Sequence, residues 1–559
     1  MISNSEIAEM LSYTADLSEL HNGNPFKIKS YQSAAYRIDK MNTQLATLTA
    51  DELAAQPAIG KSIAAKIHEI VTTGTFAELN ELVEQTPAGV IDLFKVKGIG
   101  PKKIAYIWHN LGIESIGELL YACKENRLLQ AKGFGQKTQQ NIIESIEFIF
   151  ENAHKFHYYK VEKAALMLID AIATQIPNIL IDMCGELRRK CETLDKIELV
   201  AGIAPDVLFQ HLKSIPFLSE LTLQGTSIMG KLEPQLPVCV YTCTPQQFAY
   251  HLWKYTGSDE HTALLNADPN ASSELDIYTT NKLAFIPAEL RENKGEIQWA
   301  AAGQLPELIT TENLRGTLHN HTQYSDGKHS LREMALYAKQ LGYEYLGVCD
   351  HSQSAQYAGG LKPDVVLKQF AEIDSLNKEL APFRIFKGIE SDILGDGSLD
   401  YDDRLLAQFD FVVASVHSNL KMNEEKAMMR LMRAIENPYT TILGHPTGRL
   451  LLMREGYPID HKIIIDACAA HGVCIEINAN PYRLDLDWRW IDYAIQKNVM
   501  LSINPDAHEM EGYHDMYYGV CVARKGGLTA NNCLNTFSAV DVEQYFSNKR
   551  QKTNRHLHG

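Results

Sequence analysis

The sequence lacks the features that mark several large classes of protein. No apolar run approaches the ~20 residues that a membrane-spanning helix needs. Residues 1–23 contain no basic segment followed by an apolar core, as a secretory signal peptide would. The ten cysteines are scattered without a Cys-x-x-Cys pair, so we expect reduced thiols and no disulfide framework. These absences predict a cytoplasmic protein with no membrane partner.

A surplus of basic residues is missing as well. The 53 lysines and arginines are outnumbered by 69 aspartates and glutamates, which gives a net charge of −16. This balance disfavours a protein that coats nucleic acid through bulk electrostatics, although local patches and backbone amides of an acidic protein still bind phosphates. At 559 residues the chain is too long for one core, so about three to four domains are expected.

The C-terminal half is organised around residues 318–327, Leu-His-Asn-His-Thr-Gln-Tyr-Ser-Asp-Gly. His319 and His321 are separated by one residue on an extended segment, so their side chains point the same way. Asp326 can turn back toward them from the loop that follows. These three residues predict half of a metal site.

The remaining candidate ligands follow apolar, β-branched runs, of which there are about seven in this half. The runs 344–349, 383–389, 409–416, 440–444 and 499–504 lead into ligand-type residues, and the run 474–477 adds Glu476 and Asn478. In a parallel β/α barrel the C-terminal strand ends open onto one face, so these side chains converge. The candidate metal ligands are His319, His321, Asp326, His351, Glu390, His417, His445, Asp506 and His508.

The type and number of these residues indicate which metals to expect. Imidazoles and carboxylates without thiolates favour Zn²⁺, Mn²⁺ or Fe²⁺ over a structural cysteine–zinc site. Nine ligands are too many for one ion. The sequence therefore predicts two or three divalent ions, with manganese or zinc favoured.

Several motifs in this half resemble those of PHP (polymerase and histidinol phosphatase) domains, in particular the PHP domain fused to bacterial family X DNA polymerases (PolX). The motifs are LHNHTQYSDG, CDHS, GIESDILGDGSLDY, DFVVASVHS, GHPTGR, EINANPYRLDL and INPDAH. The resemblance spans essentially the whole chain and fills all nine ligand positions. It implies a distorted β/α barrel, a trinuclear metal centre and a metal-dependent 3′-5′ exonuclease activity on DNA.

Three further residues, Asp392, Arg449 and Arg483, fall in the matching motifs. An arginine beside a metal cluster suits a phosphate through bidentate hydrogen bonds. The alternative for each of the three is a structural ion pair. Asp392 and Arg449 are taken as the candidate catalytic residues.

Residues 1–150 contain a repeated glycine motif, at 58–61 (Ala-Ile-Gly-Lys), 98–103 (Gly-Ile-Gly-Pro-Lys-Lys) and 133–137 (Gly-Phe-Gly-Gln-Lys). Each resembles a helix-hairpin-helix, in which glycines allow a tight turn whose N–H groups bind a DNA phosphate at a helix N-terminus. The first motif has Ala58 where the others have glycine. The predicted DNA contacts are Gly60, Lys61, Lys66, Gly98, Gly100, Lys102, Gly133, Gly135 and Lys137.

The same region resembles the small lyase domain of family X polymerases. Lys66 matches the position at which lyase members of that family carry the lysine that forms a Schiff base. Such a lysine needs a depressed pKa to be nucleophilic. Two alternatives for Lys66 are a solvated lysine on a helix and a contact to a DNA phosphate. We favour these alternatives over the Schiff-base role.

Residues 155–310 resemble the palm and thumb of family X polymerases but lack the catalytic carboxylates. A polymerase palm needs carboxylates to hold two Mg²⁺ ions. The family's Gly-Asp-x-Asp becomes 195–198, Asp-Lys-Ile-Glu, and the third aspartate position is assigned to Pro237. Glu186 replaces a serine that would donate to the triphosphate. Lys196, Glu198, Pro237 and Glu186 thus predict a degenerate polymerase site that binds DNA without synthesis.

The expected fold is multidomain α and α/β: a helical helix-hairpin-helix N-terminal region, a nucleotidyltransferase-like α+β palm with thumb, and a C-terminal PHP distorted β/α barrel. The expected domains are 1–80 (lyase-like), 81–153 (fingers-like), 154–245 (degenerate palm), 246–312 (thumb) and 313–559 (PHP). The predicted function is a DNA-repair 3′-5′ exonuclease, acting without sequence preference on gapped, nicked or 3′-ended DNA. Three alternatives stay open: an active gap-filling polymerase, a phosphatase of small phosphomonoesters, and a non-enzymatic DNA-binding scaffold.

Overall fold

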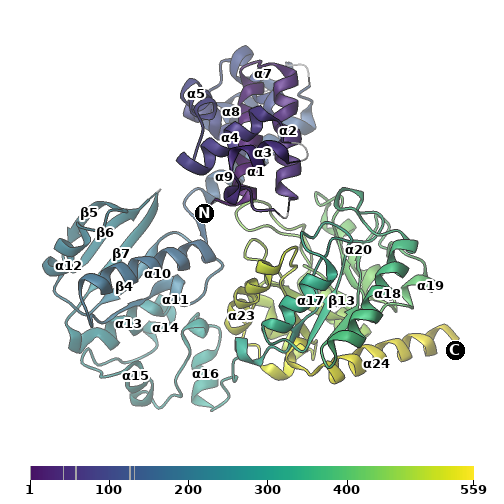
Figure 1. Cartoon of the computed structure of the whole chain (residues 1–559). Coiled ribbons are helices and arrows are strands. Elements are labelled where there is room, and N and C mark those ends of the chain that lie inside the picture. The colour runs from purple at the N-terminus through teal and green to yellow at the C-terminus, as the bar shows by residue number, and fades with distance from the viewer. Residues whose placement is uncertain are drawn as a thin grey trace. The chain divides into compact units, whose positions relative to one another are not determined.

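The computed structural model describes residues 2–41, 43–56, 59–124, 127–130, 133–233 and 235–558, so Ala58 of the first glycine motif lies outside it. The chain divides into two compact units, Met1–His154 and Lys155–Gly559. Both are drawn in Figure 1, coloured along the chain. None of the described helices has the length and apolarity that crossing a lipid bilayer requires.

The first unit is helical throughout its described residues. Amphipathic helices bury one aliphatic stripe each in a shared core that includes Leu11, Ile38, Ile67 and Ile104. Its α-helices are α1 (Asn4–Leu20), α2 (Pro25–Asp39), α3 (Ala50–Ala55), α4 (Lys61–Thr73), α5 (Ala77–Gln85), α6 (Ala88–Asp92), α7 (Pro101–Leu111), α8 (Ile116–Lys124) and α9 (Gln136–Asn152).

The second unit begins with a mixed five-stranded sheet in the order β2-β4-β7-β6-β5. β4 and β7 are parallel, while the other neighbouring pairs are antiparallel. The strands are β2 (Ile181–Met183), β4 (Ile197–Ala201), β5 (Leu218–Gln224), β6 (Ser227–Leu232) and β7 (Leu236–Thr242). Leu168 of α10 (Tyr158–Gln175) and Leu208 of α12 (Pro205–Leu212) pack against Leu199 and Val240 of the sheet.

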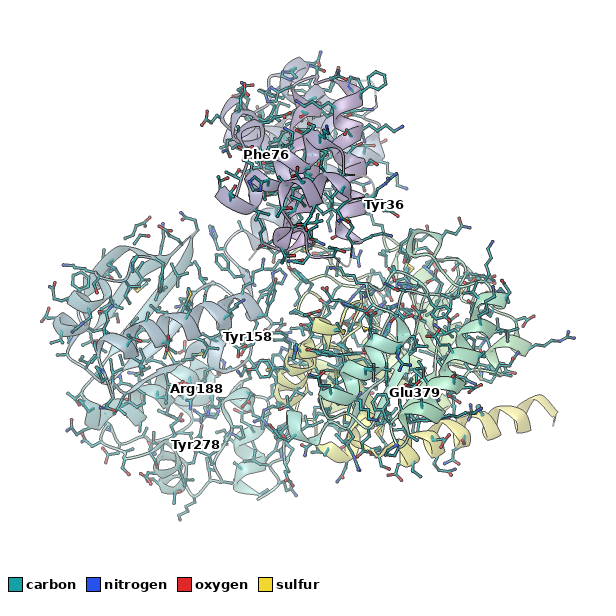
Figure 2. All side chains as sticks on the ribbon, in the orientation of Figure 1. Tyr36, Phe76, Tyr158, Arg188, Tyr278 and Glu379 are labelled. Atoms are coloured by element: carbon teal, nitrogen blue, oxygen red, sulfur yellow. The ribbon has the colours of Figure 1, made fainter. Side chains whose placement is uncertain are left out.

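A small helical segment follows this sheet. It comprises α13 (Phe248–Thr256), α14 (Asp259–Ala263), α15 (Glu274–Thr280) and α16 (Glu296–Ala301). Its core surrounds Tyr278 and Trp253, and Tyr278 is labelled in Figure 2. The buried Arg291 guanidinium donates to Glu274 (2.6 Å) and to the Ile286 carbonyl (3.0 Å), so the segment contains an internal ion pair.

The remainder of the second unit is a ring of parallel strands surrounded by helices. A three-stranded sheet, β10-β9-β8, and a five-stranded sheet, β11-β12-β13-β14-β15, contain only parallel pairs. Parallel bridges His351–Glu390 and Asn320–Ala507 join the two sheets on both sides. This is the distorted β/α barrel that the sequence predicts.

The barrel strands are short, and helices occupy most of the crossovers between them, as parallel pairing requires. The strands are β8 (Gly316–Thr317), β9 (Tyr345–Val348), β10 (Arg384–Lys387), β11 (Glu390–Asp392), β12 (Val413–Ser415), β13 (Ile442–Leu443), β14 (Cys474–Asn478) and β15 (Leu501–Asn504). The helices are α17 (Leu331–Gln340), α18 (Pro363–Leu380), α19 (Asp403–Leu406), α20 (Glu424–Glu436), α21 (His461–His471), α22 (Ile491–Gln496), α23 (Met516–Lys525) and α24 (Ala539–His558).

One strand departs from the sequence prediction. The run 383–389 was expected to form one strand that ends at Glu390, but the chain changes sheets there and Glu390 opens β11. At the break, a Cβ on Gly388 would lie 2.4 Å from the Phe411 ring, so the backbone passes against that ring. Glu390 therefore lies within a sheet junction, where its side chain is buried.

Apolar side chains fill the barrel interior at the beginnings of the strands. The polar residues lie at the other end. Phe546 of α24 packs on Phe386 and Phe411, with ring centroids 5.4 and 4.9 Å apart. Helix α24, yellow in Figure 1, thus covers this apolar end of the ring. The barrel is a packed core and not a pore.

Candidate metal centre and DNA-binding residues

The nine predicted metal ligands come together at the polar end of the barrel. Ligand atoms within 4.8 Å of one another define three groups, and His321 and His351 each belong to two of them. The groups are His321, Asp326, His351 and His508; His319, His321 and Asp506; and His351, Glu390 and His417. His445 adjoins the third group, with its Nε2 3.1 Å from Glu390 Oε1.

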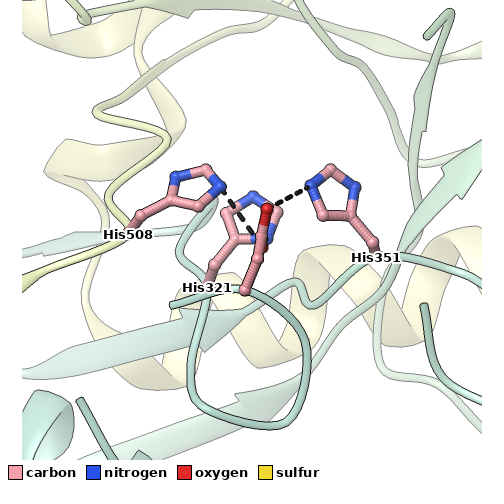
Figure 3. A group of neighbouring side chains, drawn as sticks. His321, His351 and His508 are labelled. Carbon is pink, nitrogen blue, oxygen red and sulfur yellow. Dashed lines mark ion pairs between the residues drawn. The ribbon is translucent and has the colours of Figure 1, made fainter. Parts of the chain in front are cut away.

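The rings of His321, His351 and His508 face a common point in Figure 3. His321 follows β8, His351 follows β9 and His508 follows β15, so the ring of parallel strands gathers residues that are far apart in sequence. The Asp326 carboxylate lies 3.4 Å from His508 Nε2 and 3.7 Å from His351 Nε2.

The geometry of the cluster leaves buried polar atoms without hydrogen bonds. Among the described residues, these atoms include His319 Nε2, His321 Nδ1, His351 Nδ1, His445 Nδ1 and Glu390 Oε2. A buried polar group without a partner costs about 1–3 kcal/mol. Divalent cations bound by imidazole nitrogens and carboxylate oxygens would satisfy these atoms, so the donor set fits two or three such ions.

Charges within the cluster divide the histidines into two kinds. Burial lowers the pKa of His417, but Glu390 and Asp392 outweigh it and raise that pKa to about 10. Burial and the neighbouring His508 and His351 lower the pKa of His321 to about 3. The carboxylates thus attract positive charge to the cluster, which is what binding of cations requires.

Two carboxylates lie behind the histidines and orient them. His319 Nδ1–H donates to Glu476 (2.7 Å), and His417 Nδ1–H donates to Asp392 (2.6 Å). Such contacts direct the other ring nitrogen toward a metal. Asp392, a candidate catalytic residue in the sequence, contacts the outer nitrogen of His417. In the sequence, Glu476 was indicated by its position at the end of an apolar run, where the other candidate ligands also occur.

The two arginines of the motifs lie in different surroundings. The Arg449 guanidinium donates to Asp487 (2.6 Å) and to the carbonyls of Arg483 and Leu484. These bonds tie Arg449 to the loop after β14. They correspond to the structural pairing that the sequence left open as the alternative to a phosphate contact. Arg483 instead reaches the cluster, with its Nε 3.6 Å from Asp506 Oδ2.

Tyr357 is a further residue at the cluster that the motifs did not indicate. Its ring centroid lies 6.2 Å from that of His351, and 74% of the residue is exposed. An exposed aromatic ring beside a buried polar cluster can stack against a nucleobase. The signal available in the sequence was an aromatic residue shortly after the CDHS motif.

The glycine motifs of the first unit lie at helix N-termini, as predicted. Gly60, Gly100 and Gly135 are the N-cap residues of α4, α7 and α9. Gly98 and Gly133 have φ of 89° and 93°, in the left-handed region that favours glycine. A Cβ built at any of these five glycines would meet nothing within 4 Å. The turns are therefore open to the close approach of a phosphate.

The lysines of these motifs fall into two groups. Lys61, Lys102 and Lys137 are exposed at the starts of their helices. Lys66 is mostly buried: its ammonium lies 2.8 Å from Glu78 and 5.2 Å from the Phe76 ring centroid. Burial would raise the pKa of Glu78, but hydrogen bonds from Lys27, Lys66 and Tyr31 lower it to about 2. Lys66 is thus held by a carboxylate and not directed at a bound phosphate.

Comparison with known proteins identifies the family. Residues 2–76 match a helix-hairpin-helix domain, residues 90–147 a SAM-like helix-hairpin-helix tandem, and residues 317–480 a PHP domain. A Bacillus subtilis protein named DNA polymerase/3′-5′ exonuclease PolX is 33% identical over 97% of this chain and 98% of its own length. The chain belongs to the PolX family.

Shorter relatives match a smaller part of this PolX family member. A protein named probable phosphatase from Thermoanaerobacter sp. is 26% identical over 42% of this chain and 95% of its own length. Another of that name, from Caldanaerobacter subterraneus, is 29% identical over 43% of this chain and 94% of its own length. Both matches thus cover less than half of this chain and nearly all of the named phosphatases.

In the polymerase-like sheet of this PolX family member, the Glu198 carboxylate has several internal partners. Glu198 on β4 contacts the Lys196 ammonium (3.0 Å) and accepts a hydrogen bond from the Tyr241 hydroxyl (2.8 Å). Its side chain also packs on Gly185, where a Cβ would lie 2.0 Å from Glu198 Oε2. Internal partners therefore occupy the Glu198 carboxylate.

The register of this sheet bears on the third aspartate position, which the sequence assigned to Pro237. A second carboxylate that shares a metal with Glu198 must lie beside it on the neighbouring strand. The residue of β7 that pairs with Glu198 is Cys239, not Pro237, which pairs with Lys231 of β6. Burial raises the pKa of the Cys239 thiol, so this position supplies no negative charge.

The paired arginines of the segment are likewise engaged internally. Arg188, labelled in Figure 2, donates two hydrogen bonds to Glu274, at 2.9 and 2.7 Å. Arg189 donates to Glu292 (2.9 Å) and to the Thr256 carbonyl (2.8 Å). Burial raises the pKa of the nearby Glu186 carboxyl. Arg188 and Arg189 are therefore both paired with carboxylates inside the segment.

Proposed function

We propose that the PHP barrel of this protein is a metal-dependent 3′-5′ exonuclease that degrades DNA, and that its palm-like segment no longer synthesises DNA. The carrying observation is the buried cluster with several unsatisfied ligand atoms, in a chain whose other unit offers open glycine turns for phosphates. The name of the Bacillus subtilis relative includes 3′-5′ exonuclease, which supports the first part of this proposal. The same name includes DNA polymerase, so the second part rests on the palm residues of this chain alone.

The proposed ligand groups follow the geometry of the cluster. One ion would be held by His321, Asp326, His351 and His508, a second by His319, His321 and Asp506, and a third by His351, Glu390 and His417 with His445. When bound, such ions lower the pKa of a coordinated water and stabilise the charge of a departing oxygen. Manganese and zinc suit these ligands best.

The residues around the cluster have separate proposed roles. Glu476 and Asp392 hold the rings of His319 and His417 in place through their outer nitrogens. Arg483 supplies a positive charge beside Asp506, where a substrate phosphate would enter. The Tyr357 ring receives the base of the 3′-terminal nucleotide, which sets the terminal phosphodiester next to the ligands.

We also propose a division of labour along the chain. Residues 1–80 and 81–153 bind DNA phosphates without reading sequence, residues 154–245 and 246–312 form a DNA-binding relic of palm and thumb, and residues 313–559 carry the hydrolytic site. Gapped, nicked and 3′-ended DNA are the proposed substrates.

The deciding experiment compares products. Purified protein with Mn²⁺ should release nucleoside 5′-monophosphates from a 3′-labelled gapped duplex and leave the 5′ end intact. The second candidate, a phosphatase of small monoesters, has support in the names of the shorter relatives. Release of inorganic phosphate from p-nitrophenyl phosphate, with no degradation of DNA, would favour that candidate and contradict ours.

Substitution of Tyr357 tests the stacking role. Tyr357→Ala should raise KM for 3′-ended DNA by about tenfold, because stacking of one base contributes about 1–3 kcal/mol. The exposed position makes an effect on folding small. Tyr357→Phe retains the ring and should behave as the parent protein in steady-state assays. An Ala variant with unchanged KM would remove Tyr357 from the substrate path.

The glycine turns allow a test that separates charge from folding. Aspartate and serine are both good N-cap residues, so Gly100 and Gly135 can be replaced by either without loss of the helices. The Asp pair places negative charge where the phosphate approaches, and duplex affinity should fall by about tenfold or more. The slope of log affinity against log salt should decrease by about 1 for each lost contact.

The matched serine pair, Gly100→Ser with Gly135→Ser, controls for the added side chain. It should lose less affinity than the aspartate pair, as measured by fluorescence anisotropy over a range of salt concentrations. Equal affinity of the parent, serine and aspartate proteins would show that these turns do not contact DNA.

A further inference from the structure

A cavity of about 250 Å³ lies in the second unit, apart from the metal cluster's ligands. Lys294, Trp299, Trp488, Arg489 and Lys525 are among its lining residues. Lys294 and Trp299 come from the helical segment around α16, while Trp488 and Arg489 belong to the loop after β14 and Lys525 to α23. Two indoles and three cations thus converge on one cavity.

The three cations surround a single indole ring. The ammonium groups of Lys294 and Lys525 lie 3.9 and 4.4 Å from the Trp488 ring centroid, and the Arg489 guanidinium carbon lies 4.6 Å from it. Like charges brought this close repel one another unless anions compensate them. The anionic partners of each cation therefore decide whether the cavity has unbalanced positive charge.

Two of the three cations already have anionic partners. The Lys525 ammonium is fully buried and donates to Glu292 and to the Arg189 carbonyl. Arg489 donates to Glu192 (2.7 Å) and to Asp487 (2.9 Å). The second carboxylate of the lining, Asp492, accepts from Gln496 (2.7 Å).

Lys294 is different. Within the described residues its ammonium has no ion pair and no hydrogen bond, and its contact is with the Trp488 ring. Burial lowers the pKa of Lys294, as do Arg489 and Lys525, against the smaller opposing effects of Asp487 and Glu292. An anion that entered the cavity would relieve this repulsion and pair with a free cation.

The apolar part of the lining limits the kind of anion. Trp299 and Leu290 present a flat ring and an aliphatic surface to the cavity. A ligand with both a phosphate and a planar ring satisfies the two halves of the site, because the ring stacks on the indole. The volume is near that of one nucleotide and excludes a duplex.

We propose that this cavity is a second binding site, which takes a single nucleotide with its phosphate on Lys294 and its base against Trp299. The nucleotide is either free or the end unit of a DNA strand, since both offer the same chemistry. The proposal does not rest on the nuclease function, because none of the lining residues belongs to the metal cluster.

Binding is measured by titration calorimetry with the full-length protein in excess EDTA, so that the metal cluster cannot retain phosphate. The probes are deoxyadenosine 5′-monophosphate, deoxyadenosine, inorganic phosphate and a 5′-phosphorylated tetrathymidylate. We expect saturable binding of the monophosphate, with affinities of deoxyadenosine and of phosphate lower by about tenfold or more. If the natural occupant is the end of a DNA strand, the oligonucleotide binds more tightly than the monophosphate. If the natural occupant is a free nucleotide, the monophosphate binds more tightly.

Two substitutions assign the binding to this cavity. Lys294→Ala and Trp299→Ala should each weaken monophosphate or oligonucleotide binding by about tenfold. Lys213→Ala removes an exposed lysine outside the cavity and should bind as the parent does. Trp299→Phe keeps a flat ring and should retain most of the affinity, which guards against a Trp299→Ala protein that folds poorly.

The result that overturns the proposal is clear in each arm. It is wrong if neither the monophosphate nor the oligonucleotide saturates the parent protein. It is also wrong if Lys294→Ala, Trp299→Phe and Trp299→Ala all bind both probes as tightly as the parent does. Circular dichroism must show in that case that Trp299→Ala is folded. A failed nuclease assay with intact binding here would contradict only the proposed function of the barrel.

Discussion

Glu390→Gln should abolish degradation of DNA by this protein. Glu390 is the carboxylate shared most widely in the cluster: its oxygens lie 3.0 Å from His351, 3.1 Å from His417 and 3.1 Å from His445. The amide keeps the shape and removes the charge that holds cations among these rings. A loss of about 4 kcal/mol in transition-state stabilisation lowers the rate by roughly a thousandfold.

The measurement is single-turnover release of 3′-labelled nucleotide in Mn²⁺, together with the metal content of the purified protein. Glu379→Gln is the matched control. Glu379 is an exposed carboxylate on α18 that pairs with Arg332, and it is labelled in Figure 2. The control should cleave at the parent rate, and both variants should retain DNA affinity. A Glu390→Gln protein that binds its metals and cleaves like the parent would show that the site is assigned wrongly.

The cluster could be predicted from the sequence because each ligand is marked by its immediate neighbours in the chain. The alternation of His319 and His321 on an extended segment, and ligand-type residues after apolar runs, fix which side chains face the polar end of a parallel barrel. The break at Gly388 escaped this reasoning, since it depends on the approach of Phe411 from another strand. The position of Glu390 nevertheless survives the break, because the bridge to His351 keeps it at the junction.

Partners across the fold could not be predicted in the same way. Arg449 and Arg483 belong to neighbouring motifs, and their spacing in the sequence makes both equally good candidates to bind a phosphate. The structure separates them through Asp487, which binds the Arg449 guanidinium and leaves Arg483 near Asp506. The partner of Asp392 could not be predicted either, since the outer nitrogen of His417 comes from another strand.

The choice between Pro237 and Cys239 shows a further limit of sequence patterns. Residues two apart on a strand share a face, so the alternation of side chains cannot distinguish them. Only the pairing of β4 with β7 places Cys239 beside Glu198. The expectation that this position lacks a carboxylate is unaffected. A neutral thiol supplies no negative charge, and neither does a proline.

The palm-like segment should not extend a primer. Where two divalent ions would have to bind, Glu198 contributes one negative charge and Lys196, 3.0 Å away, cancels it. Cys239 adds none. Each ion would lose several kcal/mol of stabilisation, and each ~1.4 kcal/mol is about tenfold in rate. We expect no extension above the level of a control without enzyme.

The test uses a gapped primer–template with deoxynucleoside triphosphates and either Mg²⁺ or Mn²⁺. His319→Ala serves as the background, so that degradation by the barrel cannot conceal synthesis. Restoring carboxylates with Lys196→Asp and Cys239→Asp should still give no extension, because Glu274 continues to hold Arg188, and Arg189 stays bound to Glu292. Template-directed extension by the His319→Ala protein alone would mean that the segment is a working polymerase, and that Glu198 binds a metal in spite of Lys196.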